Sequence, residues 1–254
     1  MNRVEAKGLS VDFGATRILH DINIDVHGAS MVGVIGPNGA GKSTLLRALA
    51  GLIPIQGDVQ LNARPLSALS LDTLAKQRTF LPQDSTIHWP LSVAATVALG
   101  RFPHGDATTL SGQSAIDRAM AAANVTQFRH RPVTELSGGE RARVMLARIL
   151  ATEAAIIIAD EPAAQLDPRH HWEALRVLRT AAANGAVVIL ALHDLTAAAR
   201  MCDQVLVMNA GKVEAFGPPT QILTQELLEC VFGVDALIGT TDGAPFIVPL
   251  RARG

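Results

Sequence analysis

The sequence predicts an α/β protein with a parallel-sheet core, an N-terminal antiparallel β subdomain and an inserted helical subdomain. Two buried apolar strands, Ala155–Ala159 and Ala186–Leu192, flank a helix, and a strand–helix–strand unit of this kind forms a right-handed parallel crossover. Between about residues 84 and 150, long apolar runs give way to alanine-rich helical segments. We therefore expect a single domain over residues 1–254, with a helical subdomain at about 84–150 inserted into the core.

The strands follow from apolar periodicity. Asp21–Val26 alternates polar and apolar residues, the period of a half-exposed strand, and Val4–Phe13 is predicted to be its antiparallel partner. Short apolar runs predict the other strands, namely Met31–Ile35, Val59–Leu61 (a return to the antiparallel layer) and Gln204–Asn209.

The helix between the two buried strands has clear ends. Asp167 can cap it, Pro168 suits its first turn, and Asn184-Gly185 can end it. The tail Gly243–Gly254 has no clear assignment. The other predicted helices are Ser43–Ala50, Val93–Leu99, Ser114–Ala123, Glu140–Leu150 and one near Thr224–Val231.

Composition excludes several classes of protein. The formal net charge is −1, so no basic field argues for nucleic acid. The longest apolar stretches, near Ala154–Ala159 and Ala186–Leu192, fall far below the roughly 18 residues that span a bilayer. The N-terminus, starting with Met1–Glu5, lacks the apolar stretch of an export signal, so we do not expect export. Cys202 and Cys230 lack the spacing of a disulfide framework, and we expect two reduced thiols.

A glycine-rich loop predicts phosphate binding. Gly36–Ser43 fits the pattern G-x-x-x-x-G-K-S, after a strand and opening a helix. Its backbone N–H groups and the helix dipole attract an anion. Lys42 should reach the β- and γ-phosphates, and Ser43 should bind Mg²⁺. The alternative is a chance glycine-rich turn.

Two carboxylates end a buried strand. Asp160 and Glu161 directly follow Ile156–Ala159, and ligands of open α/β sheets lie at the carboxyl ends of strands. Asp160 is placed to hold Mg²⁺, directly or through water, and Glu161 could activate an attacking water as a general base. The alternative is an ordinary acidic strand end.

The pentapeptide Leu136–Glu140, LSGGE, is the most informative segment. Ser137 and Glu140 fit an S-x-x-E capping box, so a plain helix start is one interpretation. That interpretation does not explain Gly138 and Gly139, each of which lowers helix propensity by about 1 kcal/mol. Two glycines are useful where a phosphate must approach the backbone at a helix N-terminus.

With the phosphate loop, this pentapeptide makes the chain resemble the ATP-binding cassette (ABC) family over roughly residues 3–240. The resemblance implies a P-loop NTPase cassette with a RecA-like core. It also implies that two copies meet head to tail and sandwich two ATP molecules, with Mg²⁺, between phosphate loop and signature pentapeptide. ATP binding then closes the dimer and hydrolysis opens it.

The resemblance also gives functional roles to residues whose neighbours in the sequence indicate none. His193 matches the switch histidine, which contacts the γ-phosphate; taken alone, it would be a packed or capping residue. Gln83 matches the glutamine of the Q-loop; the alternative is a surface glutamine beside a proline turn. Phe13 matches the aromatic that stacks on adenine, with a core phenylalanine as the alternative. Ala163–Asp167 matches the D-loop.

The resemblance completes three sets of expected site residues. The catalytic residues are Lys42, Gln83, Glu161 and His193, and the magnesium ligands are Ser43, Gln83 and Asp160. The nucleotide contacts are Phe13, Gly36, Pro37, Asn38, Gly39, Ala40, Gly41, Lys42, Ser43, Thr44, Ser137, Gly138, Gly139 and Asp167.

Other stretches resemble the subgroup that serves importers of iron–siderophore complexes, haem and cobalamin, with haem as the first choice. They include Trp89–Val93, Ala98–Arg101, His193–Arg200 and Phe216–Pro219. The implied partners are a second copy of the chain, two integral membrane permease subunits and, indirectly, a substrate-binding protein. The implied location is peripheral, on the cytoplasmic face of the inner membrane, without membrane insertion.

Two other functions are considered. A soluble non-transport cassette, such as an iron–sulfur assembly ATPase, would share the motifs. A P-loop kinase would need neither the signature nor His193. Among other side chains, adjacent His170 and His171 do not share a helix face, which favours a solvated helix over a metal site. Arg141, Arg143 and Arg148 are expected to form local salt bridges rather than to bind nucleic acid.

Overall fold

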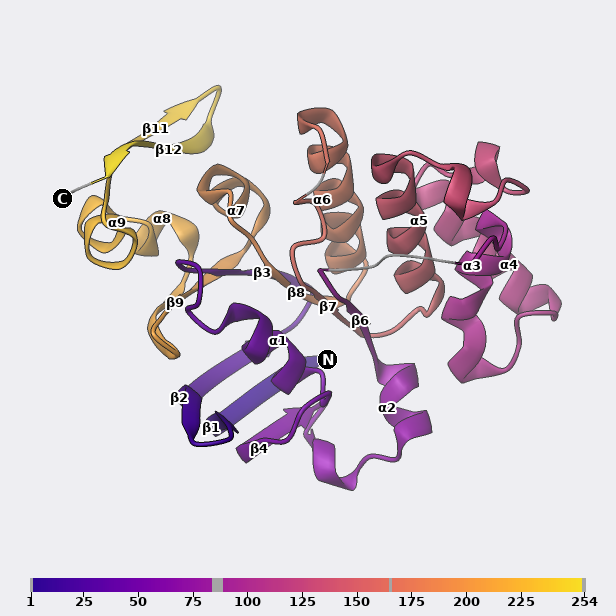
Figure 1. Cartoon of the computed structure of the whole chain (residues 1–254), viewed down its shortest axis with the longest axis horizontal. Helices are drawn as coiled ribbons and strands as arrows, with labels where there is room; N and C mark the ends of the chain where they lie inside the picture. The colour runs from indigo at the N-terminus through magenta and orange to yellow at the C-terminus, as the bar shows by residue number, and fades with distance from the viewer. Residues whose placement is uncertain (1, 84–88, 165, 253–254) are drawn as a thin grey trace.

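A six-stranded sheet forms the centre of the computed structural model, which describes residues 2–83, 89–164 and 166–252 (Figure 1). Its strands are β3 (Ser30–Ile35), β6 (Arg78–Leu81), β7 (Ile156–Ala159), β8 (Val187–Ala191), β9 (Gln204–Asn209) and β10 (Lys212–Gly217). Their order is β10-β9-β3-β8-β7-β6, with β10 antiparallel to β9 and the rest parallel. The parallel pairing of β7 with β8 confirms the predicted crossover.

The two faces of this sheet build two hydrophobic cores. Successive residues of a strand point to opposite faces, and every residue of β8 is buried. Val188 and Leu190 join one core, with α6 (Pro168–Ala183) and α7 (Leu195–Met201). Ile189 joins the other, with α1 (Lys42–Leu49).

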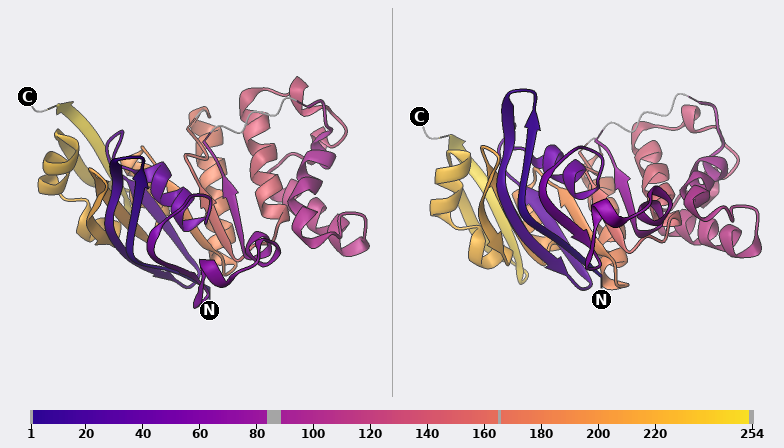
Figure 2. Two further views of the ribbon diagram at one scale, coloured as in Figure 1. Left: turned by 60° about the horizontal axis from the view of Figure 1, so that its bottom comes forward. Right: turned by 90° about the horizontal axis from the view of Figure 1, so that it is seen from below.

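A four-stranded antiparallel sheet packs over the α1 face, as Figure 2 shows. Its order is β2-β1-β4-β5, with β1 (Arg3–Phe13), β2 (Thr16–His27), β4 (Gln56–Leu61) and β5 (Arg64–Pro65). Val4 pairs with Val26 on one side and with Leu61 on the other. The predicted N-terminal antiparallel layer, including the return of the chain near Val59–Leu61, is confirmed.

Helices occupy the end of the molecule beyond β6 (Figure 1). They are α3 (Val93–Ala98), α4 (Leu110–Ala122) and α5 (Gly138–Ala151), with 3₁₀ turns at Leu99–His104, Thr126–Phe128 and Val133–Glu135. Another helix, α2 (Leu71–Gln77), precedes β6 in the chain, follows a 3₁₀ turn at Leu66–Ala68 and lies below β6 in Figure 1. The predicted helices of this region are confirmed. The interpretation of this region as an inserted subdomain remains a proposal. Its predicted start near Asp84 lies outside the described residues.

The predicted salt bridges of Arg141, Arg143 and Arg148 are wrong. In the described part of the chain, none of the three guanidinium groups pairs with a carboxylate. The reason is that α5 packs between α4 and α6, which buries much of its surface. Arg143 is only 7% exposed, and its Nε and Nη1 atoms find no acceptor among the described residues. Burial also lowers the pKa of the Arg148 guanidinium.

The C-terminal region holds structure that the sequence left unassigned. After α8 (Pro219–Ile222) and the predicted α9 (Gln225–Phe232), an antiparallel hairpin forms from β11 (Val234–Thr241) and β12 (Ala244–Ala252). The hairpin lies at the opposite end of the molecule from α3 and α4 (Figure 1). Among the described residues, no helix has the length and apolar character needed to span a bilayer.

Candidate functional site

The loop from β3 to α1 requires glycine at its first position. A Cβ atom on Gly36 would lie 2.2 Å from the carbonyl oxygen of Met208, and the residue has φ +150°. Gly41, with φ 98°, precedes the first turn of α1. These two glycines let the backbone turn sharply from the strand into the helix, so the N–H groups of the loop surround the space in front of the helix N-terminus.

That space is a cavity of about 740 Å³. It is lined by Ile18, Asn38, Gly39, Ala40, Gly41, Lys42, Ser43, Thr44, Gln83, Glu161 and His193. Gly36 and Pro37 line a neighbouring cavity of about 370 Å³ instead, together with Asn38 and His193. Ile18 was not predicted, because an apolar residue of an alternating strand carries no sign of a ligand.

Lys42 is the buried cation of the cavity. The residue is 7% exposed, and its Nζ donates to the carbonyl oxygens of Gly36 at 2.7 Å and Pro37 at 3.1 Å. Burial lowers the pKa of Lys42, while the charges of Glu161 and Asp160 act in the opposite direction. A partly desolvated ammonium group beside free N–H groups is suited to a polyanionic ligand.

Asp160 does not itself line the cavity, but it bonds to Ser43, which does, and it keeps one oxygen unused. The Ser43 hydroxyl donates to Oδ1 of Asp160 at 3.1 Å. Oδ2 is buried and has no partner among the described residues, and the residue is 1% exposed. Burial raises the pKa of this carboxyl, and the nearby charge of Glu161 raises it further. An unpaired carboxylate oxygen next to a hydroxyl is the kind of oxygen donor set that Mg²⁺ prefers.

Glu161 forms hydrogen bonds with two other predicted site residues. Its Oε1 accepts a hydrogen bond from His193 Nε2 at 2.5 Å, and its Oε2 accepts one from Gln83 Nε2 at 2.9 Å. The three side chains follow the parallel strands β7, β8 and β6, so the shared edge of the sheet brings them together. Glu161 itself has φ 51°. Such a conformation is uncommon for a residue with a side chain and clusters at functional sites.

The signature pentapeptide starts α5 as predicted. Ser137 Oγ accepts from the N–H of Glu140 at 3.3 Å, and the Glu140 carboxylate accepts from the N–H of Ser137 at 2.8 Å. This confirms the capping box. A Cβ atom on Gly138 would meet no atom of the described residues within 4 Å, and Ser137 and Gly138 are exposed. Neither residue lines the phosphate-loop cavity.

Phe13 and Asp167 also lie outside that lining. Phe13 ends β1 and is 52% exposed, so it is not the core phenylalanine of the alternative interpretation. Asp167 caps α6, accepting from the N–H of His170 at 3.0 Å, which confirms the predicted cap. Gln165 of the D-loop match lies outside the described residues. His170 and His171 have different partners, Asp167 and the carbonyl of Ala163 respectively.

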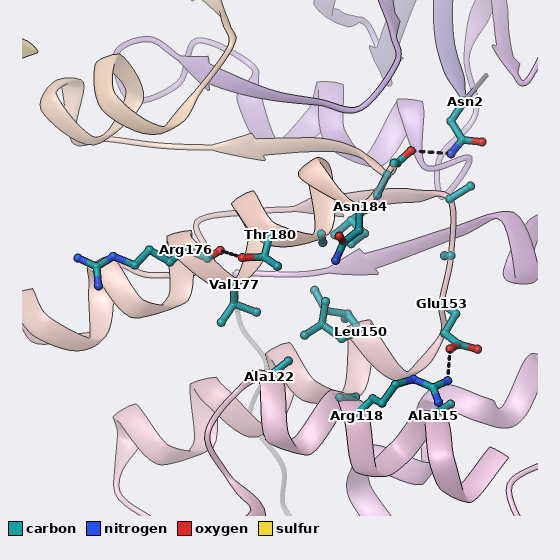
Figure 3. Close-up of a pocket in the computed structure, with 18 residues that line it drawn as sticks. Asn2, Ala115, Arg118, Ala122, Leu150, Glu153, Arg176, Val177, Thr180 and Asn184 are labelled. Atoms are coloured by element: carbon teal, nitrogen blue, oxygen red, sulfur yellow. Dashed lines mark hydrogen bonds and ion pairs between the residues drawn. The ribbon is translucent and has the colours of Figure 1, made fainter. Parts of the chain in front are cut away.

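A second cavity, of about 720 Å³, lies between the α4–α5 pair and α6 (Figure 3). Alanine side chains form much of its wall. Its charged groups are partly paired, since Arg118 Nη2 bonds Glu153 Oε1 at 2.7 Å. None of the predicted site residues lines it. The phosphate-loop cavity is therefore the candidate site.

Comparisons with known proteins agree with this geometry. A family model described as "ABC transporter" matches residues 19–164. The chain is 41% identical to the hemin import ATP-binding protein HmuV of Thermobifida fusca, covering 97% of this chain and 88% of that protein. It is 41% identical to the cobalamin import ATP-binding protein BtuD of Halobacterium salinarum, covering 98% of this chain but only 64% of that protein.

Among solved structures, the chain resembles a metal-chelate type ABC transporter in an inward-facing conformation. The TM-score is 0.83 at 25% identity, and the match covers 99% of this chain and 98% of that one. A second neighbour is cbiO1 of Clostridium perfringens, described as part of the ABC transporter complex cbiONQ. Its TM-score is 0.77 at 25% identity, with 89% of this chain and 92% of that chain covered.

Proposed function

The chain belongs to the ABC transporter family, and from this premise we propose that it is the ATP-hydrolysing subunit of an importer for iron chelates, haem or cobalamin. Haem is the first choice, because the hemin import relatives of Thermobifida fusca and Streptomyces coelicolor, at 41% and 40% identity, are matched over 88% and 90% of their length. The cobalamin import relative, also 41% identical, is matched over only 64% of its length. The observation that carries the enzymatic part is the convergence of Gln83, Glu161 and His193 beside the phosphate loop.

In this proposal the phosphates of ATP bind at the N-terminal end of α1. The backbone from Asn38 to Thr44 lines the cavity and offers N–H donors, and Lys42 supplies the positive charge. Ser43 and the unpaired Oδ2 of Asp160 would hold Mg²⁺, with the Gln83 amide within the same cavity. The metal would neutralise charge that develops on the phosphate oxygens.

Glu161 is the proposed general base. In the structure both of its carboxylate oxygens already accept hydrogen bonds, from His193 and Gln83. A water to be activated needs one of these oxygens. We propose that His193 leaves Glu161 for the γ-phosphate when ATP enters, and that the freed oxygen then accepts the proton of the attacking water.

The signature acts on a second copy of the chain in this proposal. None of the residues that the structure describes requires glycine at position 138, since a Cβ there would lie more than 4 Å from all of their atoms. A close approach of phosphate from outside the chain supplies the missing reason. Two copies then meet head to tail and enclose two ATP molecules, with Phe13 stacking on adenine and Asp167 at the seam between the copies.

The transport partners are two membrane permease subunits and, indirectly, a substrate-binding protein. Support comes from the helical region that follows Gln83, where Trp89, Leu99 and Phe102 expose large apolar side chains. Exposed apolar side chains of this size are typical of sites of protein contact. The chain would thus sit peripherally on the cytoplasmic face of the inner membrane.

One experiment tests the whole proposal. The chain is reconstituted with the membrane subunits that co-purify with it, and ATP hydrolysis is measured with binding proteins loaded with haem, an iron–siderophore complex or cobalamin. Stimulation by one loaded binding protein is expected, with haem first. A chain that hydrolyses ATP but co-purifies only with soluble complexes would contradict the transport role and favour the assembly-type alternative.

A further inference from the structure

The C-terminal hairpin packs against α7, the helix that begins two residues after His193 (Figure 1). Ile247 of β12 is 5% exposed, and Leu195 of α7 is 6% exposed. Both side chains belong to the core on the α6 side of the central sheet. The hairpin lies beyond the residues that the family model matches, which end at 164. None of the hairpin residues lines the phosphate-loop cavity.

One hydroxyl group joins the hairpin to α7. Thr196 Oγ1 donates to the carbonyl oxygen of Ile247 at 2.8 Å and accepts from the N–H of the same residue at 2.9 Å. A hydroxyl can donate and accept at once, so it satisfies both backbone groups. Serine could make the same pair of bonds, whereas valine, which has the shape of threonine, could make neither.

Arg200 provides a second link one turn later in α7. Its Nε donates to the carbonyl oxygen of Pro245 at 2.6 Å. Its guanidinium carbon lies 5.9 Å from the centre of the Trp172 ring, which belongs to α6. The helix is thus fixed on one side by the hairpin and on the other by α6.

The first residues of α7 connect this anchored helix to the candidate site. Asp194 caps the helix by accepting from the N–H of Ala197 at 3.0 Å, and His193 directly precedes the cap. The lining of the cavity of about 370 Å³ includes Pro37, His193 and Ile247. The hairpin, the switch histidine and the phosphate loop therefore enclose one common space.

We propose that Thr196 is a positioning residue for ATP hydrolysis, because its two hydrogen bonds to the C-terminal hairpin fix the helix that holds His193 beside Glu161. The inference rests on the proposed role of His193 in the ATPase reaction. It assigns the hairpin a part in setting the hydrolysis rate, in addition to covering the core.

Three variants of the full chain test this inference. Thr196→Val removes both hydrogen bonds, Thr196→Ser keeps them, and Thr180→Val is the matched control. The Thr180 hydroxyl donates at 2.9 Å to the carbonyl of Arg176 within its own helix, and it bonds to no other element of the described structure. The measurements are kcat and KM for ATP hydrolysis, the affinity for ATP, and the melting temperature.

Thr196→Val is expected to lower kcat at least about tenfold, because small misplacements of a catalytic group are costly. The affinity for ATP should stay close to that of the wild type, since the phosphate loop is untouched. Thr196→Ser and Thr180→Val should keep the wild-type kcat. Should Thr196→Val fold poorly, Arg200→Gln cuts the second link instead and is expected to lower kcat in the same way.

Other results would overturn the inference. A Thr196→Val or Arg200→Gln chain with the wild-type kcat would show that the hairpin does not position His193. A Thr196→Ser chain as slow as Thr196→Val would show that the hydroxyl is not what matters. Failure of the proposed function looks different, because the wild-type chain itself would then not hydrolyse ATP.

Discussion

His193 Nε2 lies 2.5 Å from Glu161 Oε1, across 32 residues of sequence, and this contact joins the ends of β7 and β8 at the edge of the phosphate-loop cavity. Gln83 takes the other oxygen of the same carboxylate. The proposed base is therefore fully engaged before any substrate is bound. Before hydrolysis, His193 must leave Glu161 for ATP, and a water must take its place on the Glu161 carboxylate.

Replacing Glu161 with glutamine should abolish hydrolysis without preventing ATP binding. The amide keeps the size of the side chain but cannot accept a proton, and loss of a general base typically lowers kcat by about 10²–10⁴-fold. With ATP bound and uncleaved, the closed dimer should accumulate, as measured by size-exclusion chromatography. Glu214→Gln, an exposed carboxylate on β10, is the control. Hydrolysis at the wild-type rate in Glu161→Gln would rule out the assigned role.

Two glycine substitutions separate folding from function. Gly36→Ala places a Cβ 2.2 Å from the Met208 carbonyl, so unfolding free energy should fall by about 1–3 kcal/mol. The added Cβ of Gly138→Ala meets no described atom within 4 Å, so this variant should leave stability unchanged or raise it by up to about 1 kcal/mol. Because no described residue crowds position 138, we expect the ATPase rate of Gly138→Ala to fall through contacts with a second copy. Urea unfolding and ATPase assays check the pair, and full activity in Gly138→Ala would contradict the phosphate approach.

Ser137 combines a capping role with the proposed ligand role. Ser137→Ala removes the acceptor of the Glu140 N–H and should lower stability by about 1 kcal/mol. Ser137→Asp keeps a good N-cap and should retain stability, but its negative charge would face the phosphates of the second copy. Its ATPase rate should therefore drop more than that of Ser137→Ala. Equal rates in the two variants would argue that the residue acts only as a cap.

The two cysteines should differ sharply in reactivity. Burial raises the pKa of Cys202 to about 12, whereas Cys230 is exposed. The thiolate is the reactive form, so at pH 8 iodoacetamide should modify Cys230 alone in the folded chain and both thiols in urea. Mass spectrometry of peptides measures this. Rapid labelling of Cys202 without denaturant would show that the core around α7 opens readily.

Much of the central architecture was predictable, because its signals are local and strong. The apolar runs of β7 and β8 and the capping residues of α6 lie next to one another in the sequence. The placing of Glu161 and His193 at one sheet edge also followed, since both come after predicted strands and parallel strands end at one edge. Gln83 was assigned only by the family resemblance, because β6, the strand before it, was not predicted. The phosphate loop and the capping box of Ser137 have side chains at fixed spacings, so a short segment is enough to recognise them.

The rest depended on contacts that no short segment contains. β12 includes Pro245 and Pro249, which a strand accepts only where their missing N–H is not needed, as at a sheet edge. The salt bridges expected for Arg143 failed because burial of α5 depends on how α4 and α6 pack against it. Likewise the pairing of Thr196 with Ile247 spans 51 residues and involves a backbone group that any residue would offer.

The central claim is that the signature of one copy completes the phosphate loop of another. Two inactive chains, Lys42→Ala and Gly138→Asp, are co-expressed with different tags, and the mixed dimer is purified over both. One of its sites carries both lesions, while the other combines an intact phosphate loop with an intact signature. The account predicts ATP hydrolysis well above that of either variant alone. A purified mixed dimer as inactive as its two parents would contradict it.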